Sequence, residues 1–186
     1  MKKAFTLSEM LVCLAVISAL LAIFLSTLRV KPNNSMVMFR KAYNTTASVV
    51  HEMVQSPAYY ETGLLSDIDQ TSEPINGEKP TGSKKFCKVF VSFLNTVDEP
   101  NCNAGGTTSF ATSDGIVWQL PTNANFTSTS GHQIIVDVNG ENAPNCDSAS
   151  CEHPDQFTIW VRPDGKLFVQ DETARNYLKN TRHIAK

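Results

Sequence analysis

Hydrophobic and polar positions divide the chain into an apolar N-terminal stretch and a mixed remainder. Residues 10–28 form nineteen consecutive positions without a charged side chain, and Arg29 ends the stretch. A helix of about 20 apolar residues spans the hydrocarbon core of a bilayer. An ordinary secretory signal has a shorter apolar region followed by small residues at a cleavage site, and no such site follows Leu25. The pattern therefore predicts one transmembrane helix that the mature protein retains.

A second periodic pattern follows Pro32. Apolar side chains recur at intervals of three and four residues, which is the spacing of one face of an α-helix. The positions are Met36, Phe39, Tyr43, Ala47, Val50 and Val54. We therefore expect an amphipathic helix that ends near Gln55 and packs one face on a globular head.

The head begins with a loop and a short helix. Between Ser56 and Ser83 the chain is polar and carries Pro or Gly at six positions, which is typical of a loop. A helical period then returns and predicts a short helix with Ser83 as a candidate N-cap. The apolar positions of this period are Phe86, Val89, Phe90, Phe93, Leu94 and Val97.

Short strand-like runs separated by turns follow from residue 110 onward. Asp114 and Gly115, a strong tight-turn pair, separate residues 110–112 from residues 116–120. Residues 171–186 are polar and predict no element. The fold class is therefore α+β, with a long N-terminal helix, half in the membrane and half amphipathic, packed on a small and mainly antiparallel C-terminal sheet. The other predicted strands are residues 134–138, 157–162 and 166–169.

Composition allows one globular head and one anchor. The chain has 186 residues and 41% hydrophobic content, too little for two independent cores besides the membrane segment. Its net charge of −2 arises from 16 basic and 18 acidic residues, and no block of about five or more like charges is present. Charge therefore gives no indication of a nucleic-acid partner.

The cysteines divide between the two parts of the chain. Of the five cysteines, Cys13 lies in the apolar stretch, and Cys87, Cys102, Cys146 and Cys151 lie in the head. Sequence neighbours favour bridges from Cys87 to Cys102 and from Cys146 to Cys151, although three connectivities exist for four cysteines. Bridges imply an oxidising compartment, whereas reduced thiols would indicate the cytosol.

Glu9 is the acidic residue at the start of the predicted membrane helix, and its position is informative about function. It precedes the apolar stretch directly, and a carboxylate at the edge of a membrane helix costs several kcal/mol unless it finds a partner or reaches the interface. Lys2 and Lys3 favour a cytoplasmic N-terminus, although Arg29 and Lys31 reduce the charge asymmetry across the membrane.

Residues 2–9 are Lys-Lys-Ala-Phe-Thr-Leu-Ser-Glu, and the apolar stretch follows them directly. This arrangement resembles the prepilin signal that type IV pilins share with type II secretion pseudopilins. The resemblance implies cleavage between Ala4 and Phe5 by a prepilin peptidase, N-methylation of Phe5 and retention of the helix. It also implies that Glu9 aligns subunits during assembly, because the amine of an incoming subunit can neutralise the Glu9 of its neighbour. The family usually has Gly where this chain has Ala4, and a Pro within the apolar stretch that is missing here.

The head resembles the minor members of the same family. Their C-terminal half carries Asp-x-Asn-Gly, then Pro-Asn, an Asp-x-Phe strand and an Asp-Gly-Lys/Arg-Leu hairpin. The matching residues are Asp137, Asn139, Gly140, Pro144, Asn145, Asp155, Phe157, Asp164, Gly165, Lys166 and Leu167.

The resemblance implies an organisation into a leader at residues 1–4, a membrane and polymerisation helix at 5–28, a stalk helix at 29–55 and a pilin head at 56–186. It places the chain in the bacterial inner membrane as a single-pass protein with an extracytoplasmic head, and then in a pilus or pseudopilus. The implied partners are other pilin or pseudopilin subunits, the prepilin peptidase, the inner-membrane assembly machinery and membrane lipid.

The acidic and amide residues near residue 140 are a possible metal site. Asp137, Asn139, Asn145 and Asp155 offer the oxygen ligands that Ca²⁺ takes, and related pseudopilins hold calcium in a C-terminal loop. The spacing is not that of a twelve-residue calcium loop, and Asp or Asn in turns more often bonds its own backbone, so we expect no metal and keep calcium as the alternative. Cys146, Cys151 and His153 as zinc ligands are a weaker interpretation than a disulfide.

The sequence predicts a structural subunit of a filament and no enzyme. Ser, His and Asp occur without a nucleophile-elbow or paired-histidine motif, which leaves a tethered enzyme as a weak alternative. A membrane-anchored binding module, such as an adhesin or a DNA-uptake subunit, is the other alternative and requires an exposed basic or aromatic patch on the head.

Overall fold

The computed structural model describes residues 10–18, 20, 34–126, 129, 131–140 and 142–179. The chain consists of two compact units, Met1–Asn34 and Ser35–Lys186. In the first unit, residues 10–18 are helical, and residues 5–9, 19 and 21–28 of the predicted membrane and polymerisation helix lie outside the described residues. No helix within the described ranges combines the length and the apolar character that a bilayer crossing requires.

Helix α2 (Asn34–Gln55) is the predicted amphipathic helix. Its buried side is formed by Phe39, Ala42, Thr46, Val49, Val50 and Met53. Thr46 is the polar member of this side, and its hydroxyl donates to the Ala42 carbonyl at 2.9 Å, so no donor is left unsatisfied there. The helix and the head form one compact unit from Ser35 onward.

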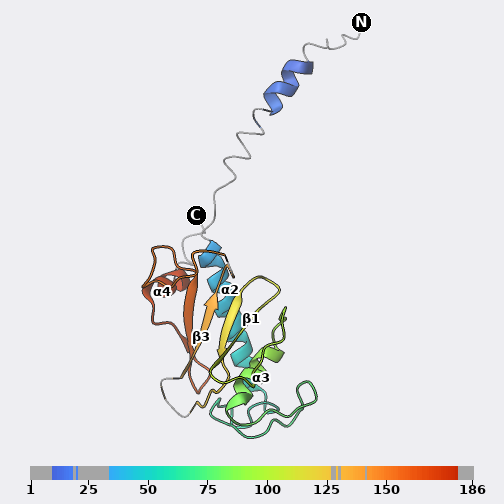
Figure 1. The fold of residues 1–186 in the computed structure, drawn as a ribbon, viewed down its shortest axis with the longest axis vertical. Coiled ribbons are helices and arrows are strands. Elements are labelled where there is room, and N and C mark those ends of the chain that lie inside the picture. The colour runs from blue at the N-terminus through green and yellow to red at the C-terminus, as the bar shows by residue number, and fades with distance from the viewer. Residues whose placement is uncertain are drawn as a thin grey trace. The chain divides into compact units, whose positions relative to one another are not determined.

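The sheet has five strands in the order of the sequence, and every neighbouring pair is antiparallel. This arrangement confirms the predicted α+β class, with a helix packed on an antiparallel sheet (Figure 1). The tight turn before β2 contains Gly115 at φ 85°, a conformation that glycine adopts without strain. The strands are β1 (Thr107–Ala111), β2 (Val117–Pro121), β3 (His132–Asp137), β4 (Gln156–Val161) and β5 (Leu167–Phe168).

The short helix of the head is α3 (Lys85–Ser92), preceded by the 3₁₀ helix η1 (Gly82–Lys84). Ser83 lies inside η1, so its predicted role as the cap is wrong, and the helix ends before Val97. The Val97 N–H instead donates to the Ala111 carbonyl of β1 at 2.8 Å. Pairing with the sheet edge therefore replaces the last predicted turn of the helix.

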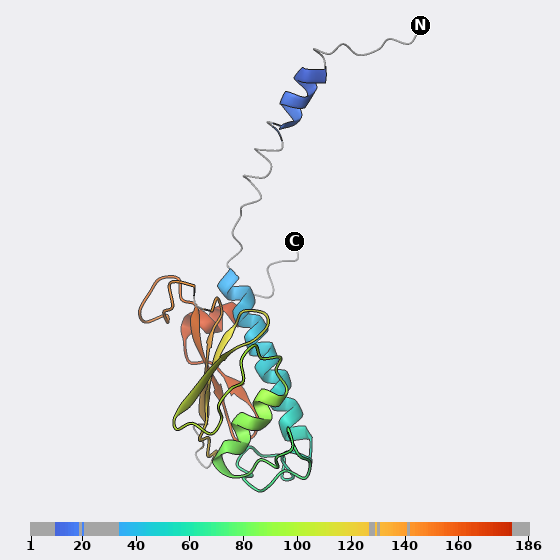
Figure 2. The ribbon, with the colours of Figure 1, turned by 45° about the vertical axis from the view of Figure 1, so that its right-hand side comes forward.

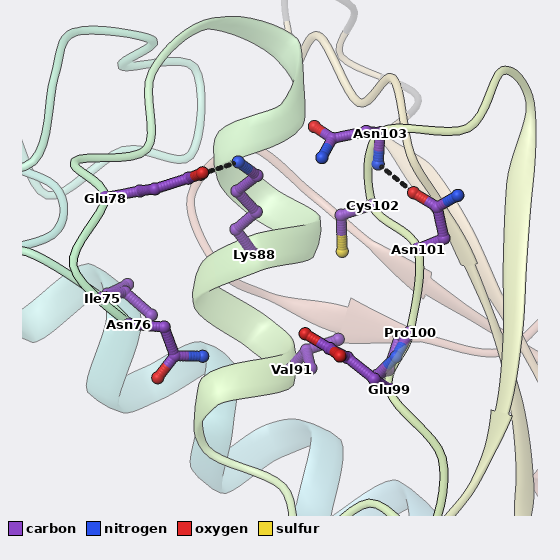
Figure 3. A pocket seen from close by; sticks show the side chains of 10 residues that line it. All are labelled: Ile75, Asn76, Glu78, Lys88, Val91, Glu99, Pro100, Asn101, Cys102 and Asn103. Atoms are coloured by element: carbon purple, nitrogen blue, oxygen red, sulfur yellow. Dashed lines mark hydrogen bonds and ion pairs between the residues drawn. The ribbon is translucent and has the colours of Figure 1, made fainter.

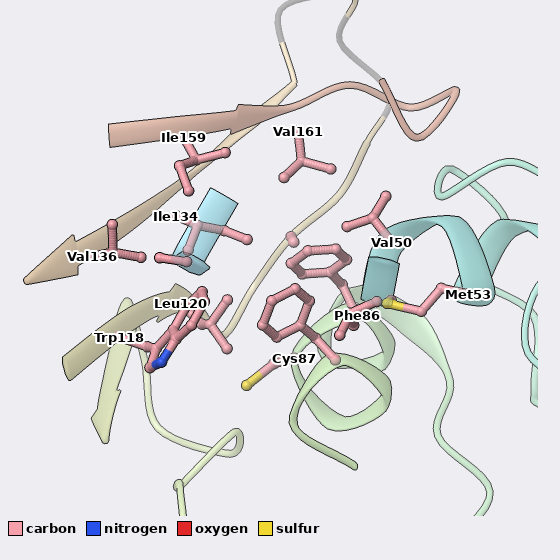
Figure 4. Packing of buried hydrophobic residues seen from close by; sticks show 14 of the residues in the cluster. Val50, Met53, Phe86, Cys87, Trp118, Leu120, Ile134, Val136, Ile159 and Val161 are labelled. Atoms are coloured by element: carbon pink, nitrogen blue, oxygen red, sulfur yellow. The ribbon is translucent and has the colours of Figure 1, made fainter. Parts of the chain in front are cut away.

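The core lies between the helices and one face of the sheet. Figure 2 shows α2 and α3 on the same side of the sheet, and Figure 4 shows their side chains meeting those of the strands. Trp118 is buried and its indole N–H donates to the Thr112 hydroxyl at 2.9 Å. The core residues labelled in Figure 4 are Val50, Met53, Phe86, Cys87, Trp118, Leu120, Ile134, Val136, Ile159 and Val161.

Helix α4 (Glu172–Lys179) lies in a segment for which the sequence pattern predicted no element. Asp171 caps it, because its carboxylate accepts the Ala174 N–H at 2.6 Å. The Arg40 side chain of α2 donates to the Tyr177 carbonyl near the end of α4 at 2.5 Å. A cation at this end is favourable for the helix dipole, so Arg40 joins the C-terminal helix to α2.

Candidate assembly surfaces

The helix at residues 10–18 has an apolar surface that its own unit leaves uncovered. Ser18 donates its hydroxyl to the Leu14 carbonyl at 2.8 Å, so the polar side chain of this helix is satisfied without water. A surface of this kind is stable only against lipid or other apolar helices. Side chains of this helix that are between 53% and 63% exposed are Met10, Leu11, Val12, Leu14, Val16 and Ile17.

The predicted processing and assembly residues stand just before this helix. Ala4, Phe5 and Glu9 lie outside the described residues, and their roles therefore stay predictions. Cys13 lies within the described helix and carries an exposed free thiol.

The four cysteines of the head form two disulfides between sequence neighbours. Cys87 of α3 is bonded to Cys102, and both residues are buried. Cys146 is bonded to Cys151 and closes a short loop before β4. The zinc alternative is wrong, since both candidate thiolates of that site are bonded to each other.

A buried carboxylate fixes this disulfide loop to the sheet. Asp155, which is 1% exposed, accepts the N–H groups of Asn145 at 2.9 Å and Cys146 at 2.7 Å. Asp137 lies nearby, and burial together with the charge of Asp155 raises its pKa above the usual value. Hydrogen bonds from Gln156 and from the Asn139 N–H oppose this rise in pKa without cancelling it.

The residues of the calcium alternative lie together in this loop. The end of the Asn145 side chain is 3.1 Å from an Asp137 carboxylate oxygen and 3.0 and 3.2 Å from the carbonyls of Gly140 and Asn142. With its amide nitrogen turned toward these oxygens, Asn145 donates its two N–H groups among the three of them. Within the described ranges, no three His, Cys, Asp or Glu side chains are grouped closely enough to share a metal ion.

A hollow of about 420 Å³ is lined by α3 and by the two loops that lie on either side of this helix (Figure 3). Its walls include the turn that carries Glu78 and the loop from Glu99 to Asn103. The Lys88 ammonium of α3 pairs with Glu78 and lowers the pKa of that carboxylate. The residues that line the hollow include no Ser, His or free Cys.

Comparison with known proteins identifies the N-terminal segment. Residues 1–25 match the model of the prokaryotic N-terminal methylation motif, which is the signal of type IV pilins and pseudopilins. The resemblance read from the N-terminal residues is thereby confirmed, and the signal is that of a pilin-like structural protein. No curated protein and no solved structure matches the chain.

Proposed function

We propose that this chain is a structural subunit of a type IV pilus-like or type II secretion pseudopilus filament. The observation that carries the proposal is the methylation signal at residues 1–25. The uncovered apolar helix that overlaps it and the α+β head that follows support the same conclusion. The subunit is held in the bacterial inner membrane before assembly, with its head outside the cytoplasm.

Processing prepares the N-terminus for assembly. A prepilin peptidase cuts between Ala4 and Phe5, which removes Lys2 and Lys3 and leaves a new amine that is then methylated. This cationic amine lies four residues before Glu9. In a growing filament the amine of an incoming subunit neutralises the Glu9 of its neighbour, which removes an otherwise costly charge from the apolar surroundings.

The head is suited to an oxidising compartment. Its two disulfides join Cys87 to Cys102 and Cys146 to Cys151. Such bonds form in the periplasm and outside the cell, whereas cytosolic thiols are kept reduced. This supports a membrane protein whose head has crossed the bilayer while the leader stays in the cytoplasm.

The mass of the mature N-terminal peptide tests the processing step. We expect native protein to begin at Phe5 with one added methyl group. Native protein that begins at Met1 would refute the proposal, because the amine that pairs with Glu9 would never form.

Filament incorporation tests the role of Glu9. We expect Glu9→Ala to leave membrane insertion unchanged and to lower the amount of subunit in sheared filaments. Glu52→Ala is the matched control, because Glu52 is an exposed acid of α2 and its loss should not alter incorporation. Equal incorporation of the Glu9 variant and the parent would contradict the assigned role.

A further inference from the structure

The face of the sheet opposite the helices carries an aromatic pair. Along β4 the residues alternate between buried and half-buried, and the buried Phe157 packs against Phe39 of α2 with the ring centroids 4.4 Å apart and the ring planes tilted by 36°. Trp160 belongs to the other set of alternating positions along β4. Its side chain therefore lies on the opposite face of the sheet and points away from the helices. It pairs with Phe168 of β5, with centroids 5.7 Å apart and ring planes 17° from parallel. Both rings are half-buried on this outer face.

Two cations flank this aromatic pair. The exposed Arg162 has its guanidinium carbon 5.6 Å from the Phe168 ring centroid. Lys166, on the turn before β5, has a side chain that is 74% exposed and is paired with Asp164 at 2.8 Å. We name Trp160, Phe168, Arg162 and Lys166 the β5-edge patch. Buried interface centres are enriched in Trp, Phe and Arg, so this patch has the composition of a protein-binding surface.

The other edge of the sheet carries a complementary surface. Thr96 forms a bridge with Thr112, and the Val97 N–H donates to Ala111, which fixes this segment beside β1. Val97 is 67% exposed, more than any other large hydrophobic residue described in the unit from Ser35 onward. Asp98 and Glu99 follow it and are also exposed. We name Val97, Asp98 and Glu99 the β1-edge loop.

The two surfaces are matched in chemistry but cannot meet within one molecule. One combines aromatic rings with two cations, one of which is also paired with Asp164, and the other combines an aliphatic side chain with two anions. They lie at opposite edges of a five-stranded sheet, and strands are spaced about 4.8 Å apart, so about 19 Å separates the outermost strands. Complementary patches at different places on one chain make a head-to-tail contact, which repeats into an open chain of copies.

We propose that the β5-edge patch of one copy binds the β1-edge loop of a second copy of this chain. This inference rests on the proposed function and adds the head contact between neighbouring subunits. Val97 covers the exposed edges of the aromatic pair, while Arg162 and Lys166 meet Asp98 and Glu99. The charges set the pairing of edges, because two like edges would bring cations against cations.

Zero-length crosslinking of the full chain in cells that assemble the filament tests the contact. A carbodiimide joins a lysine amine directly to a carboxylate that touches it, so a crosslink between copies reports direct contact. We expect a ladder of covalent multimers in which peptide mapping finds Lys166 joined to Asp98 or Glu99. The Lys166 to Asp164 crosslink stays within one chain and remains in the monomer band.

Charge reversal gives a second readout. We expect Arg162→Glu with Lys166→Glu, and separately Asp98→Lys with Glu99→Lys, to reduce the ladder about tenfold or more, since each pair removes one reacting group of the crosslink and also places like charges in contact. Combining all four substitutions in one chain should restore the ladder. The matched controls Lys84→Glu and Glu73→Lys reverse exposed charges outside both surfaces and should leave the ladder unchanged. Retained disulfides on non-reducing gels show that each variant is folded.

The outcomes separate the two proposals. A parent chain that is absent from sheared filaments overturns the proposed function, and the head contact with it. A parent that enters filaments without a peptide joining Lys166 to Asp98 or Glu99 overturns the head contact alone. The head contact is also overturned if Lys166, Asp98 or Glu99 is crosslinked to a different subunit, or if the reversal variants form the parental ladder.

Discussion

Substitution of Asp67 by Ala should show how much the buried ion pair between Asp67 and Lys85 contributes to the stability of the head. Asp67 belongs to the loop between α2 and η1, and Lys85 is the first residue of α3. Their side chains are only 4% and 2% exposed, and the Lys85 ammonium is 3.4 Å from the Asp67 carboxylate. The ammonium also donates to the Asp67 backbone carbonyl at 3.1 Å and lies 4.3 Å from the centre of the Tyr60 ring.

The structure sets the expected size of the effect. Removing one partner of a buried ion pair costs about 3–5 kcal/mol, because the remaining charge stays buried without compensation. Lys85 keeps a carbonyl and an aromatic ring in Asp67→Ala, so we expect about 3 kcal/mol, the lower end of that range. The double variant with Lys85→Met removes both charges and should return to within about 1 kcal/mol of the parent.

Urea unfolding of the head at residues 35–186, which forms a compact unit, measures these free energies. Asp164→Ala is the matched control, since it removes an exposed pair with Lys166 and should change the free energy of unfolding by less than about 1 kcal/mol. An Asp67→Ala head as stable as this control would refute the argument from burial. So would a double variant that is less stable than Asp67→Ala.

The same pair predicts a pH dependence. Burial raises the pKa of Asp67, but the N–H groups of Asp69 and Thr62 and the charge of Lys85 outweigh burial and leave the pKa below its usual value. A carboxylate with a lowered pKa stabilises the fold at pH values above its unfolded pKa of about 3.9 and loses that contribution as pH falls through its folded pKa. The stability difference between parent and Asp67→Ala should therefore be constant near neutral pH and shrink below about pH 4.

Three further predictions concern the rest of the head. Asp171→Ala removes the cap of α4 and should lower the free energy of unfolding by about 1 kcal/mol in urea titrations, whereas Asp171→Asn should keep most of it. Replacing Cys87 and Cys102 by Ser should cost about 3 kcal/mol by the same measurement, and loss of the shorter second bridge should cost less because it closes a smaller loop. Millimolar Ca²⁺ should leave the melting temperature of the head unchanged, because the Asn145 amide nitrogen already lies between the oxygens of its loop; a rise of several degrees would show that a cation displaces the amide.

The sheet and α2 were predictable because their signals are local. Asp114-Gly115 requires a tight turn, and the alternation along β4 assigns one face to the core whatever that core contains. The pairing of Cys87 with Cys102 was favoured for a similar reason, since neighbours in sequence meet easily. For the turn and for β4, the residues that decide the structure lie within a few positions of one another, and the two cysteines are 15 positions apart.

The remaining features depend on partners that sequence spacing does not reveal. Val97 continues the apolar period of α3, but pairing of its N–H with Ala111 overrides that period. Helix α4 has a local signal that was missed, namely Asp171 as a cap followed by Ala174, Tyr177 and Leu178 at helical spacing. The position of Asn145 among three oxygens depends on how the whole loop closes, which no motif specifies.

The chain thus contains two kinds of apolar surface that need different partners. The core-facing residues of α2, such as Phe39 and Val50, are fully buried within a single head. Met10 to Ile17 and, at the sheet edge, Val97 are more than half exposed, so the described residues of their own units leave them uncovered. In the proposed filament subunit, lipid covers the N-terminal helix before assembly but does not reach the head. A copy that supplies the aromatic β5 edge would cover Val97 only after assembly, which makes docking of the heads a step that follows insertion of the helix and depends on it.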